Sequence, residues 1–156
     1  MAESGSRVWN DRARDIKLAI VDAIYQHAKK YNTGLKVLEI GGQGRLGPYT
    51  EGLEYTCIDR TTAMVHPDTF MFKHDYILHP IPGEYDYVVI RYPNSLKDLG
   101  TVFQRVKECL KPAGVLFVVA LDDILARVIR LCKKRFTLAS VQKFDKVYTI
   151  MVSYNI

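Results

Sequence analysis

A cluster of glycines directly follows an acidic residue near the start of the sequence. Glu39 lies in the apolar run from Leu35 to Ile40, and Gly41, Gly42 and Gly44 come immediately after this run. Glycines let a backbone turn tightly and approach a ligand without a Cβ in the way. A carboxylate beside such a turn suits a ligand that carries an ammonium group. This segment therefore predicts a ligand-binding loop at the end of a buried strand.

A second acidic residue, Asp59, closes the next apolar run, Tyr55 to Ile58. A carboxylate at this position can accept hydrogen bonds from both hydroxyls of a ribose, so it favours a ligand that contains a nucleoside. Dinucleotide-binding folds also have a glycine-rich loop, but their GxGxxG spacing is absent here. The glycines instead follow the pattern Gly41-x-x-Gly44-x-x-Gly47.

Strands and helices alternate along the sequence, which predicts an α/β fold with an open, doubly wound, mostly parallel sheet and a C-terminal antiparallel hairpin. Its ligand should lie beyond the carboxyl ends of the first strands. We expect one domain over 1–156, with an N-terminal segment and helix over 1–34 and the core over 35–154. The predicted helices are 11–30, 95–110 and 122–134, and the predicted strands are 35–40, 55–58, 69–72, 85–90, 115–121, 136–142 and 147–154.

Two segments resemble class I S-adenosylmethionine (SAM)-dependent methyltransferases. The run Val37–Gly47 is similar to the glycine-rich loop of this family, in which an acidic residue closes the first strand. The run Val106–Leu116, which reads VKECLKPAGVL, looks like the family's LKPGG turn between the fourth helix and the fifth strand. The resemblance extends over roughly residues 35–154. It implies SAM as the cofactor and methyl transfer to a nitrogen or oxygen of an acceptor that the sequence does not identify.

The resemblance also implies roles for individual residues. Asp75 would accept a hydrogen bond from the adenine amino group, and Tyr76 would pack on the adenine ring. Tyr92 lies where an aromatic ring could face the sulfonium through a cation–π contact. No catalytic residue and no metal site are predicted. The predicted cofactor-binding residues are Glu39, Gly41, Gly42, Gln43, Gly44, Asp59, Arg60, Asp75, Tyr76, Arg91 and Tyr92.

The sequence departs from the family pattern at two places. Only about ten residues, Arg45 to Glu54, separate the glycines from the second strand, where the family has a full helix. Because Pro48 and Gly52 disfavour a helix, we expect a turn there. The loop Arg91–Asn94 lacks the Asn/Asp-Pro-Pro-aromatic motif by which DNA amino-methyltransferases hold an exocyclic nitrogen.

The net charge of +5 is concentrated near the C-terminus, since residues 121–156 hold seven Lys or Arg and three acidic residues. Arg127, Arg130 and Lys134 should form one exposed stripe on the helix over 122–134. This stripe could hold a polyanion such as nucleic acid, or an acidic partner, but should not position the methyl acceptor. The three cysteines form no CxxC pair and are expected to be buried thiols.

No apolar run approaches the roughly 20 residues of a membrane span, and we expect a cytoplasmic protein without a membrane partner. Two rival functions stay open. The first is a non-catalytic SAM-binding or regulatory protein of the same fold, which the short segment after the glycines favours. The second is a small NAD-dependent oxidoreductase, which the glycine spacing and the lack of a Tyr-x-x-x-Lys pair disfavour. The oligomeric state is not specified by the sequence.

Overall fold

A computed structural model of the chain describes the backbone of residues 2–41, 45–60, 71–91 and 96–156, and the side chains of residues 14–41, 45–60, 74–91 and 98–156. The glycine residues Gly42 and Gly44, together with Gln43 and Tyr92, therefore lie outside the described residues. The helices are α1 (Ala2–Tyr31), α2 (Leu96–Cys109) and α3 (Leu125–Lys133), with a short 3-10 helix, η2 (Gly47–Tyr49). The strands are β1 (Lys36–Ile40), β2 (Glu54–Asp59), β3 (Met71–Lys73), β4 (Tyr85–Arg91), β5 (Leu110–Leu121), β6 (Thr137–Lys143) and β7 (Tyr148–Tyr154).

The strands form one seven-stranded sheet in the order β3-β2-β1-β4-β5-β7-β6. Strands β1 to β5 pair in parallel, whereas β7 pairs antiparallel with both β5 and β6. The predicted α/β fold with a C-terminal antiparallel hairpin is therefore confirmed. From β1 the chain continues to β2 and β3 on one side of the sheet, and from β4 it continues to β5 on the other side. The carboxyl ends of β1 and β4 therefore mark the switch point of the sheet, where ligands bind in such folds.

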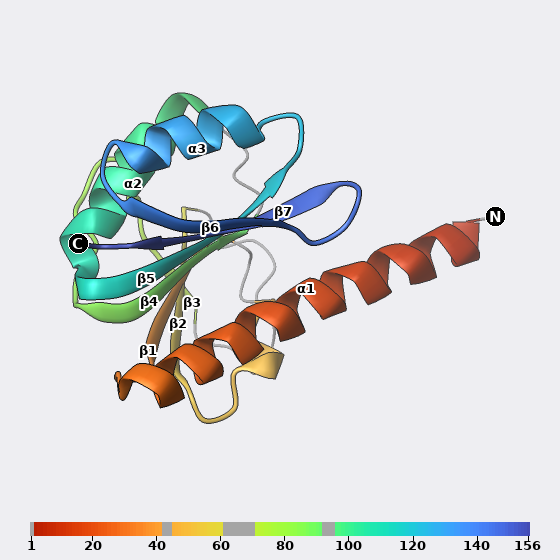
Figure 1. Cartoon of the computed structure of the whole chain (residues 1–156), viewed down its shortest axis with the longest axis horizontal. Coiled ribbons are helices and arrows are strands. Elements are labelled where there is room, and N and C mark those ends of the chain that lie inside the picture. Colours follow the sequence, from red (N-terminus) through yellow and green to blue (C-terminus); the bar gives the residue numbers. More distant parts are fainter. Residues whose placement is uncertain (1, 42–44, 61–70, 92–95) are drawn as a thin grey trace.

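Helices cover the two faces of the sheet unequally, with α2 and α3 on one face and α1 alone on the other (Figure 1). Alternate residues of each strand point to opposite faces. Accordingly Leu38 and Ile40 pack in the core beneath α2 and α3, whereas Val37 packs against Ile16 and Ile20 of α1. The same alternation places Glu39 on the α1 face.

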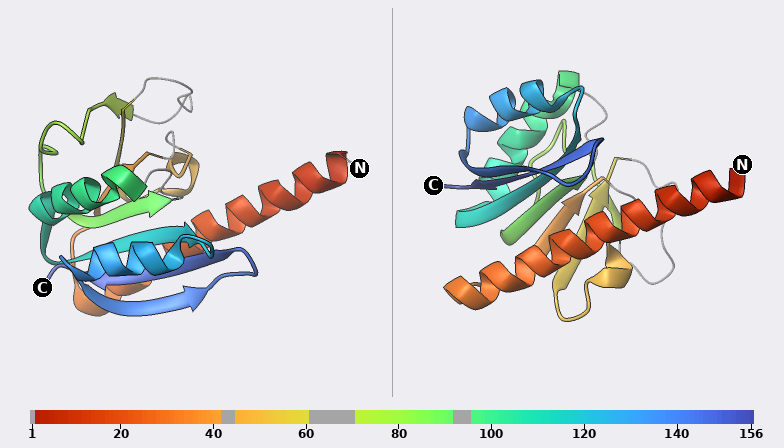
Figure 2. Two further views of the ribbon diagram at one scale, coloured as in Figure 1. Left: turned by 90° about the horizontal axis from the view of Figure 1, so that it is seen from above. Right: turned by 45° about the vertical axis from the view of Figure 1, so that its right-hand side comes forward.

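Helix α1 begins nine residues earlier than the predicted start at Asp11 and continues to Tyr31. The prediction relied on apolar periodicity, which begins only where the helix meets the core, and no proline in 2–10 stops the helix before that point. Figures 1 and 2 show the N-terminal part of α1 projecting past the sheet. Within the described residues no helix, α1 included, is both long and apolar enough to cross a bilayer.

The predicted LKPAG turn forms a bulge at the start of β5, which begins at Leu110 rather than at the predicted Val115. Tyr85 pairs with Leu110 and Tyr87 with Val115, so residues 111–114 protrude from the ladder. Asn155 holds this protrusion, since its side-chain amide donates to the Leu110 carbonyl oxygen at 2.8 Å. The segment that resembles the family's LKPGG turn is thus part of the sheet, at the start of β5.

The other predicted elements are found with small shifts at their ends. The segment after the glycines holds only η2, with Pro48 in its first turn, so the predicted replacement of a helix by a turn is confirmed. Helix α3 begins at Leu125 rather than at Asp122, because the backbone first forms a tight turn in which the Leu125 amide donates to the Asp122 carbonyl. All three cysteines are buried free thiols, as predicted.

The Tyr87 hydroxyl joins the end of α1 to the sheet, which gives a test of the fold. It lies 2.6 Å from Thr33 Oγ1 and 2.9 Å from His27 Nδ1. We expect Tyr87→Phe to lower the free energy of unfolding by about 1 kcal/mol, because a buried hydroxyl and its hydrogen bonds are lost. Urea unfolding measures this change. Tyr154→Phe is the control, since no hydrogen bond of the Tyr154 hydroxyl is present in the described part of the chain; an equal loss in both variants would contradict the assignment.

Candidate functional site

Most of the predicted site residues meet at the carboxyl edge of the sheet. Glu39 and Gly41 lie at the end of β1, Asp59 ends β2, and Arg91 ends β4. Their strands are neighbours in the sheet, in the order β2, β1, β4. Asp75 and Tyr76 follow β3 at the same edge. Four predicted site residues lie outside the described residues, namely Gly42, Gln43, Gly44 and Tyr92.

A buried ion pair joins the ends of β1 and β4. Arg91 Nε donates to Glu39 Oε2 at 2.6 Å, and the two side chains are 3% and 0% exposed. The other carboxylate oxygen, Oε1, accepts a hydrogen bond from the Tyr55 hydroxyl, also at 2.6 Å. Both oxygens of Glu39 are therefore bonded within the protein. The sequence prediction placed Arg91 in a loop after the strand; in the structure it is the last, buried residue of β4, because its partner lies on the adjacent strand.

The Tyr55 hydroxyl stays protonated in this setting. Burial raises the pKa of Tyr55, and the negative charge of Glu39 and the hydrogen bond to it raise this pKa further. Tyr55 therefore acts as a neutral donor to the carboxylate. The sequence analysis did not select Tyr55, although residues two apart on a strand share a face, so that Tyr55, Cys57 and Asp59 all point to the side of the sheet that carries Glu39.

Lys17 is a further basic residue whose charge interacts with those of Glu39 and Arg91. Lys17 of α1 lies with Nζ 5.6 Å from the centre of the Tyr49 ring, which belongs to η2. Burial lowers the pKa of Lys17, as do the nearby positive charges of Arg91 and Arg45, whereas Glu39 acts in the opposite direction. The sequence analysis missed Lys17 because the residue falls between the apolar positions of α1, where a lysine is usually only solvated.

Gly41 follows β1 directly and is partly exposed. Its amide still donates to the Ile58 carbonyl at 2.9 Å, and its φ is +72°. A Cβ at this position would meet no atom of the described residues within 4 Å. Glycine is favoured here because a positive φ is unfavourable for residues with a Cβ.

A second cluster of charged residues lies at the ends of β2 and β3. Arg60 Nε is 3.4 Å from Asp75 Oδ1, and Arg60 Nη1 is 3.8 Å from Asp98 Oδ2 at the start of α2. Burial raises the pKa of Tyr76, and Asp59 is the next largest cause of this rise. Asp98 was not among the site residues predicted from the sequence.

The Asp75 carboxylate also stabilises its own turn. Its Oδ1 accepts hydrogen bonds from the backbone amides of Ile77 at 3.2 Å and Leu78 at 3.4 Å. Short polar side chains commonly hold turns in this way. The role of Asp75 towards adenine, which the family resemblance implies, stays a prediction.

The chemistry of these two clusters fits a SAM molecule. The Asp59 carboxylate can accept hydrogen bonds from hydroxyl groups, and Tyr76, which follows β3, offers an aromatic ring. The basic groups around Glu39 suit the charged amino-acid end. Among the described residues, no group of three or more His, Cys, Asp or Glu side chains is arranged to hold a metal ion.

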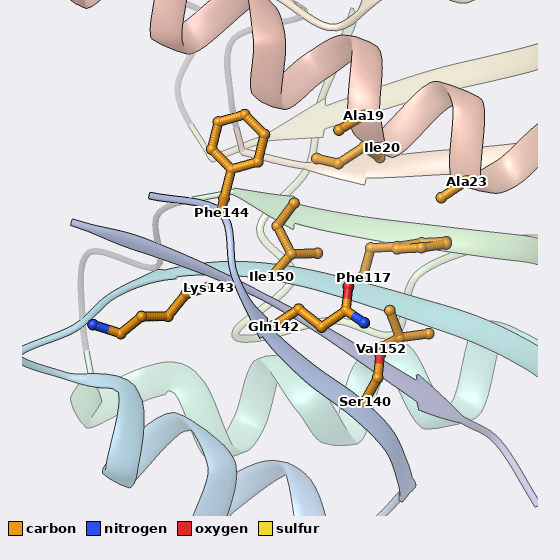
Figure 3. A pocket seen from close by; sticks show the side chains of 10 residues that line it. All are labelled: Ala19, Ile20, Ala23, Phe117, Ser140, Gln142, Lys143, Phe144, Ile150 and Val152. Atoms are coloured by element: carbon orange, nitrogen blue, oxygen red, sulfur yellow. The ribbon is translucent and has the colours of Figure 1, made fainter. Parts of the chain in front are cut away.

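A separate cavity of about 220 Å³ lies between α1 and the β6–β7 hairpin (Figure 3). Its walls are mainly apolar, and none of the predicted site residues lines it. It exists because α1 alone covers this face of the sheet and leaves part of the hairpin uncovered. The side chains that form its apolar walls include Ala19, Ile20, Ala23, Phe117, Ile150 and Val152.

Solved structures resemble this chain over most of its length, at low sequence identity. The N-methyltransferase NodS from Bradyrhizobium japonicum WM9, in complex with S-adenosyl-L-homocysteine, is 14% identical, with a TM-score of 0.64 over 88% of this chain and 86% of that one. The PH0226 protein from Pyrococcus horikoshii OT3 is 17% identical, with a TM-score of 0.71 over 93% and 91%. The 1,6-didemethyltoxoflavin-N1-methyltransferase from Burkholderia thailandensis is 17% identical, with a TM-score of 0.66 over 98% and 83%.

No protein-family model and no curated protein sequence matches the chain. The assignment therefore depends on structure, namely on the strand order β3-β2-β1-β4-β5-β7-β6 with β7 antiparallel and on the three likenesses above. Together they show that this chain has the fold of the class I SAM-dependent methyltransferases.

Proposed function

We propose that the chain binds SAM at the carboxyl edge of the sheet and transfers its methyl group to a nitrogen or oxygen of an acceptor. The observation that supports this proposal is that Asp59 ends β2, Gly41 follows β1 and Arg91 ends β4, so that the three residues lie at one edge of the sheet on neighbouring strands. The switch point at the carboxyl ends of parallel strands is where such folds hold their ligands.

The chain's own contribution would be to bind and align. SAM supplies an activated methyl group on a sulfonium, so the leaving group needs no further activation. The protein can act by holding donor and acceptor in line, and a base is needed only for a protonated acceptor. The cofactor-binding residues proposed here are those of the sequence prediction other than Glu39, whose two carboxylate oxygens are bonded within the protein. Asp59 would bond the ribose, and Tyr76 would pack on the base.

The acceptor is not specified by this site. The exposed basic residues of α3 allow a polyanionic partner such as nucleic acid, and a site at the strand ends also allows a small molecule. A specific observation also supports a second candidate, a SAM-binding protein without catalytic activity: both carboxylate oxygens of Glu39 are already bonded inside the protein, and the helix after the glycines is reduced to η2.

Calorimetry and a turnover assay together test these candidates. We expect SAM and S-adenosylhomocysteine to bind with a 1:1 stoichiometry, and NAD not to bind. Incubation with radiolabelled SAM and separate pools of RNA, DNA, protein and small molecules should then label one pool. Binding without label in any pool, and without S-adenosylhomocysteine formation, would favour the non-catalytic candidate; binding of NAD but not SAM would refute both.

The ribose contact of Asp59 gives a direct test by mutation. We expect Asp59→Ala to weaken SAM binding by about tenfold or more, since a hydrogen bond to a charged group contributes roughly 1.5–3 kcal/mol. Isothermal titration calorimetry measures the change. Asp123→Ala is the matched control, because Asp123 is an exposed acidic residue beyond the end of β5. Unchanged SAM affinity in a folded Asp59→Ala variant would remove Asp59 from the site.

The basic stripe of α3 should be independent of SAM binding. Arg130 and Lys134 are exposed, and α3 has nine residues that lead away from the carboxyl end of β5. At about 1.5 Å per residue, the last turn of α3 lies roughly 13 Å from that edge. We expect Arg130→Glu combined with Lys134→Glu to leave SAM affinity unchanged and to alter only salt-sensitive binding of polyanions. A loss of SAM affinity with the fold preserved would contradict this placement.

A further inference from the structure

The net charge of the chain comes from one short segment. The chain holds 22 Lys or Arg and 17 Asp or Glu, and residues 125–135 include five of the basic residues and none of the acidic ones. The rest of the chain is therefore neutral overall, and the net charge of +5 arises from α3 and the residues that end it. A segment with a single sign of charge creates a local field that attracts ligands of the opposite charge.

Basic side chains occupy almost the whole exposed side of α3. Within 125–134 the exposed residues are Ala126 and the four residues that we call the basic patch, namely Arg127, Arg130, Lys133 and Lys134. With 3.6 residues per turn, the four fall within one arc of about 120° around the helix. Val128 and Cys132, on the opposite side, are fully buried. The packing of α3 on the core therefore fixes the direction in which the patch points.

The basic patch keeps its positive charge, because no described acidic side chain pairs with it. None of its four members takes part in an ion pair with another described residue. On the adjacent helix α2, Glu108 pairs with Arg105 at 3.3 Å. Before α3, Asp122 pairs with Lys143 at 3.0 Å. Asp123 is exposed, but it precedes the first turn of α3.

The length of the patch matches the spacing of phosphates in nucleic acid. From Arg127 to Lys134 the patch extends over seven residues, or about 10.5 Å along the helix axis. One strand of nucleic acid carries a negative charge about every 3.4 Å, so about three or four successive phosphates lie over this length. The two arginines of the patch can also hold phosphate oxygens with two parallel hydrogen bonds.

Two other classes of partner fit the patch less well. A basic helix that binds a membrane surface inserts exposed apolar side chains, and Ala126 is the only exposed apolar residue of 125–134. The core of an interface between proteins is rich in aromatic residues and depleted in lysine, whereas the patch contains two lysines and no aromatic residue. Interfaces with nucleic acid are much more positively charged, which agrees with this composition.

We propose that the basic patch binds the phosphate backbone of nucleic acid and does not read its sequence. Phosphate contacts fix the position of a protein on a nucleic acid but carry no sequence information directly. The patch contains none of the candidate site residues, so this binding does not depend on the proposed function. It adds a partner where the candidate site itself specifies none.

Fluorescence anisotropy with a labelled single-stranded RNA and a labelled duplex DNA, both of mixed sequence, provides the test. We expect the wild-type chain to bind at about 50 mM salt, with a slope of log affinity against log salt of about −3, since about four phosphate charges are neutralised. Arg130→Gln combined with Lys134→Gln should weaken binding by about tenfold or more and make the slope shallower by roughly 1.5, because two contacts are lost. The stronger of the two probes identifies the preferred form of nucleic acid.

Lys29→Gln combined with Lys30→Gln is the matched control. Both lysines are exposed in the last turn of α1, and α1 lies on the opposite face of the sheet from α3 (Figure 1). This variant removes the same two charges and should leave the affinity and the salt slope nearly unchanged. Vesicles of phosphatidylcholine and phosphatidylserine in equal parts, and polyglutamate, serve as the other polyanions.

Three results would overturn the proposal. Equal weakening in the two double variants would show that binding follows net charge and not the patch. Tighter binding of the vesicles or of polyglutamate than of either nucleic acid would assign the patch to a membrane or to an acidic protein. Absence of binding of both nucleic acids to the wild-type chain would overturn it without any variant, so a misfolded variant does not prevent a decision.

Discussion

The ion pair between Glu39 and Arg91 is the constraint on which the candidate site depends. Removing two charges from water costs several kcal/mol per ion, and only close geometry with every remaining polar atom bonded compensates for this. Here the 2.6 Å contact to Arg91 and the Tyr55 hydroxyl bond both carboxylate oxygens. Because Glu39 lies near the end of β1 and Arg91 ends β4, the pair joins the ends of these two neighbouring strands. A buried pair of this kind adds little net stability, but removal of one partner would leave an uncompensated buried charge and would be strongly destabilising.

Helix α1 gives the pair its surroundings. It covers one face of the sheet without a second helix beside it, and its apolar residues Ile16, Ile20 and Ile24 pack on the strands that carry the pair. Lys17 follows Ile16 directly, and its ammonium group lies 5.6 Å from the centre of the Tyr49 ring of η2. The packing that buries Ile16 therefore also sets the position of this cation. Where α1 does not cover this face of the sheet, a cavity lies between α1 and the β6–β7 hairpin.

The sequence predicts the sheet well because buried parallel strands appear in it as continuous apolar runs. The apolar runs that became β1, β4 and most of β5 could be placed to within a few residues, and the short segment after the glycines correctly excluded a helix. The contacts of Glu39 could not be predicted. Arg91 follows an apolar run and precedes a proline, which indicates a loop, and its partner lies 52 residues away in sequence. Only the pairing of β1 with β4 brings the two charges together.

Two clusters of charged side chains lie at this edge of the sheet. Arg60, beyond the end of β2, contacts Asp75 and Asp98, and Arg91 at the end of β4 pairs with the buried Glu39. Carboxylates accept hydrogen bonds from hydroxyl and amino groups, and guanidinium groups donate to carboxylates. Under the proposed function, the Asp59 carboxylate at the end of β2 would bond the nucleoside end of SAM and so would fix where the rest of the ligand lies. A fixed position of the donor is the condition for aligning its methyl group with an acceptor.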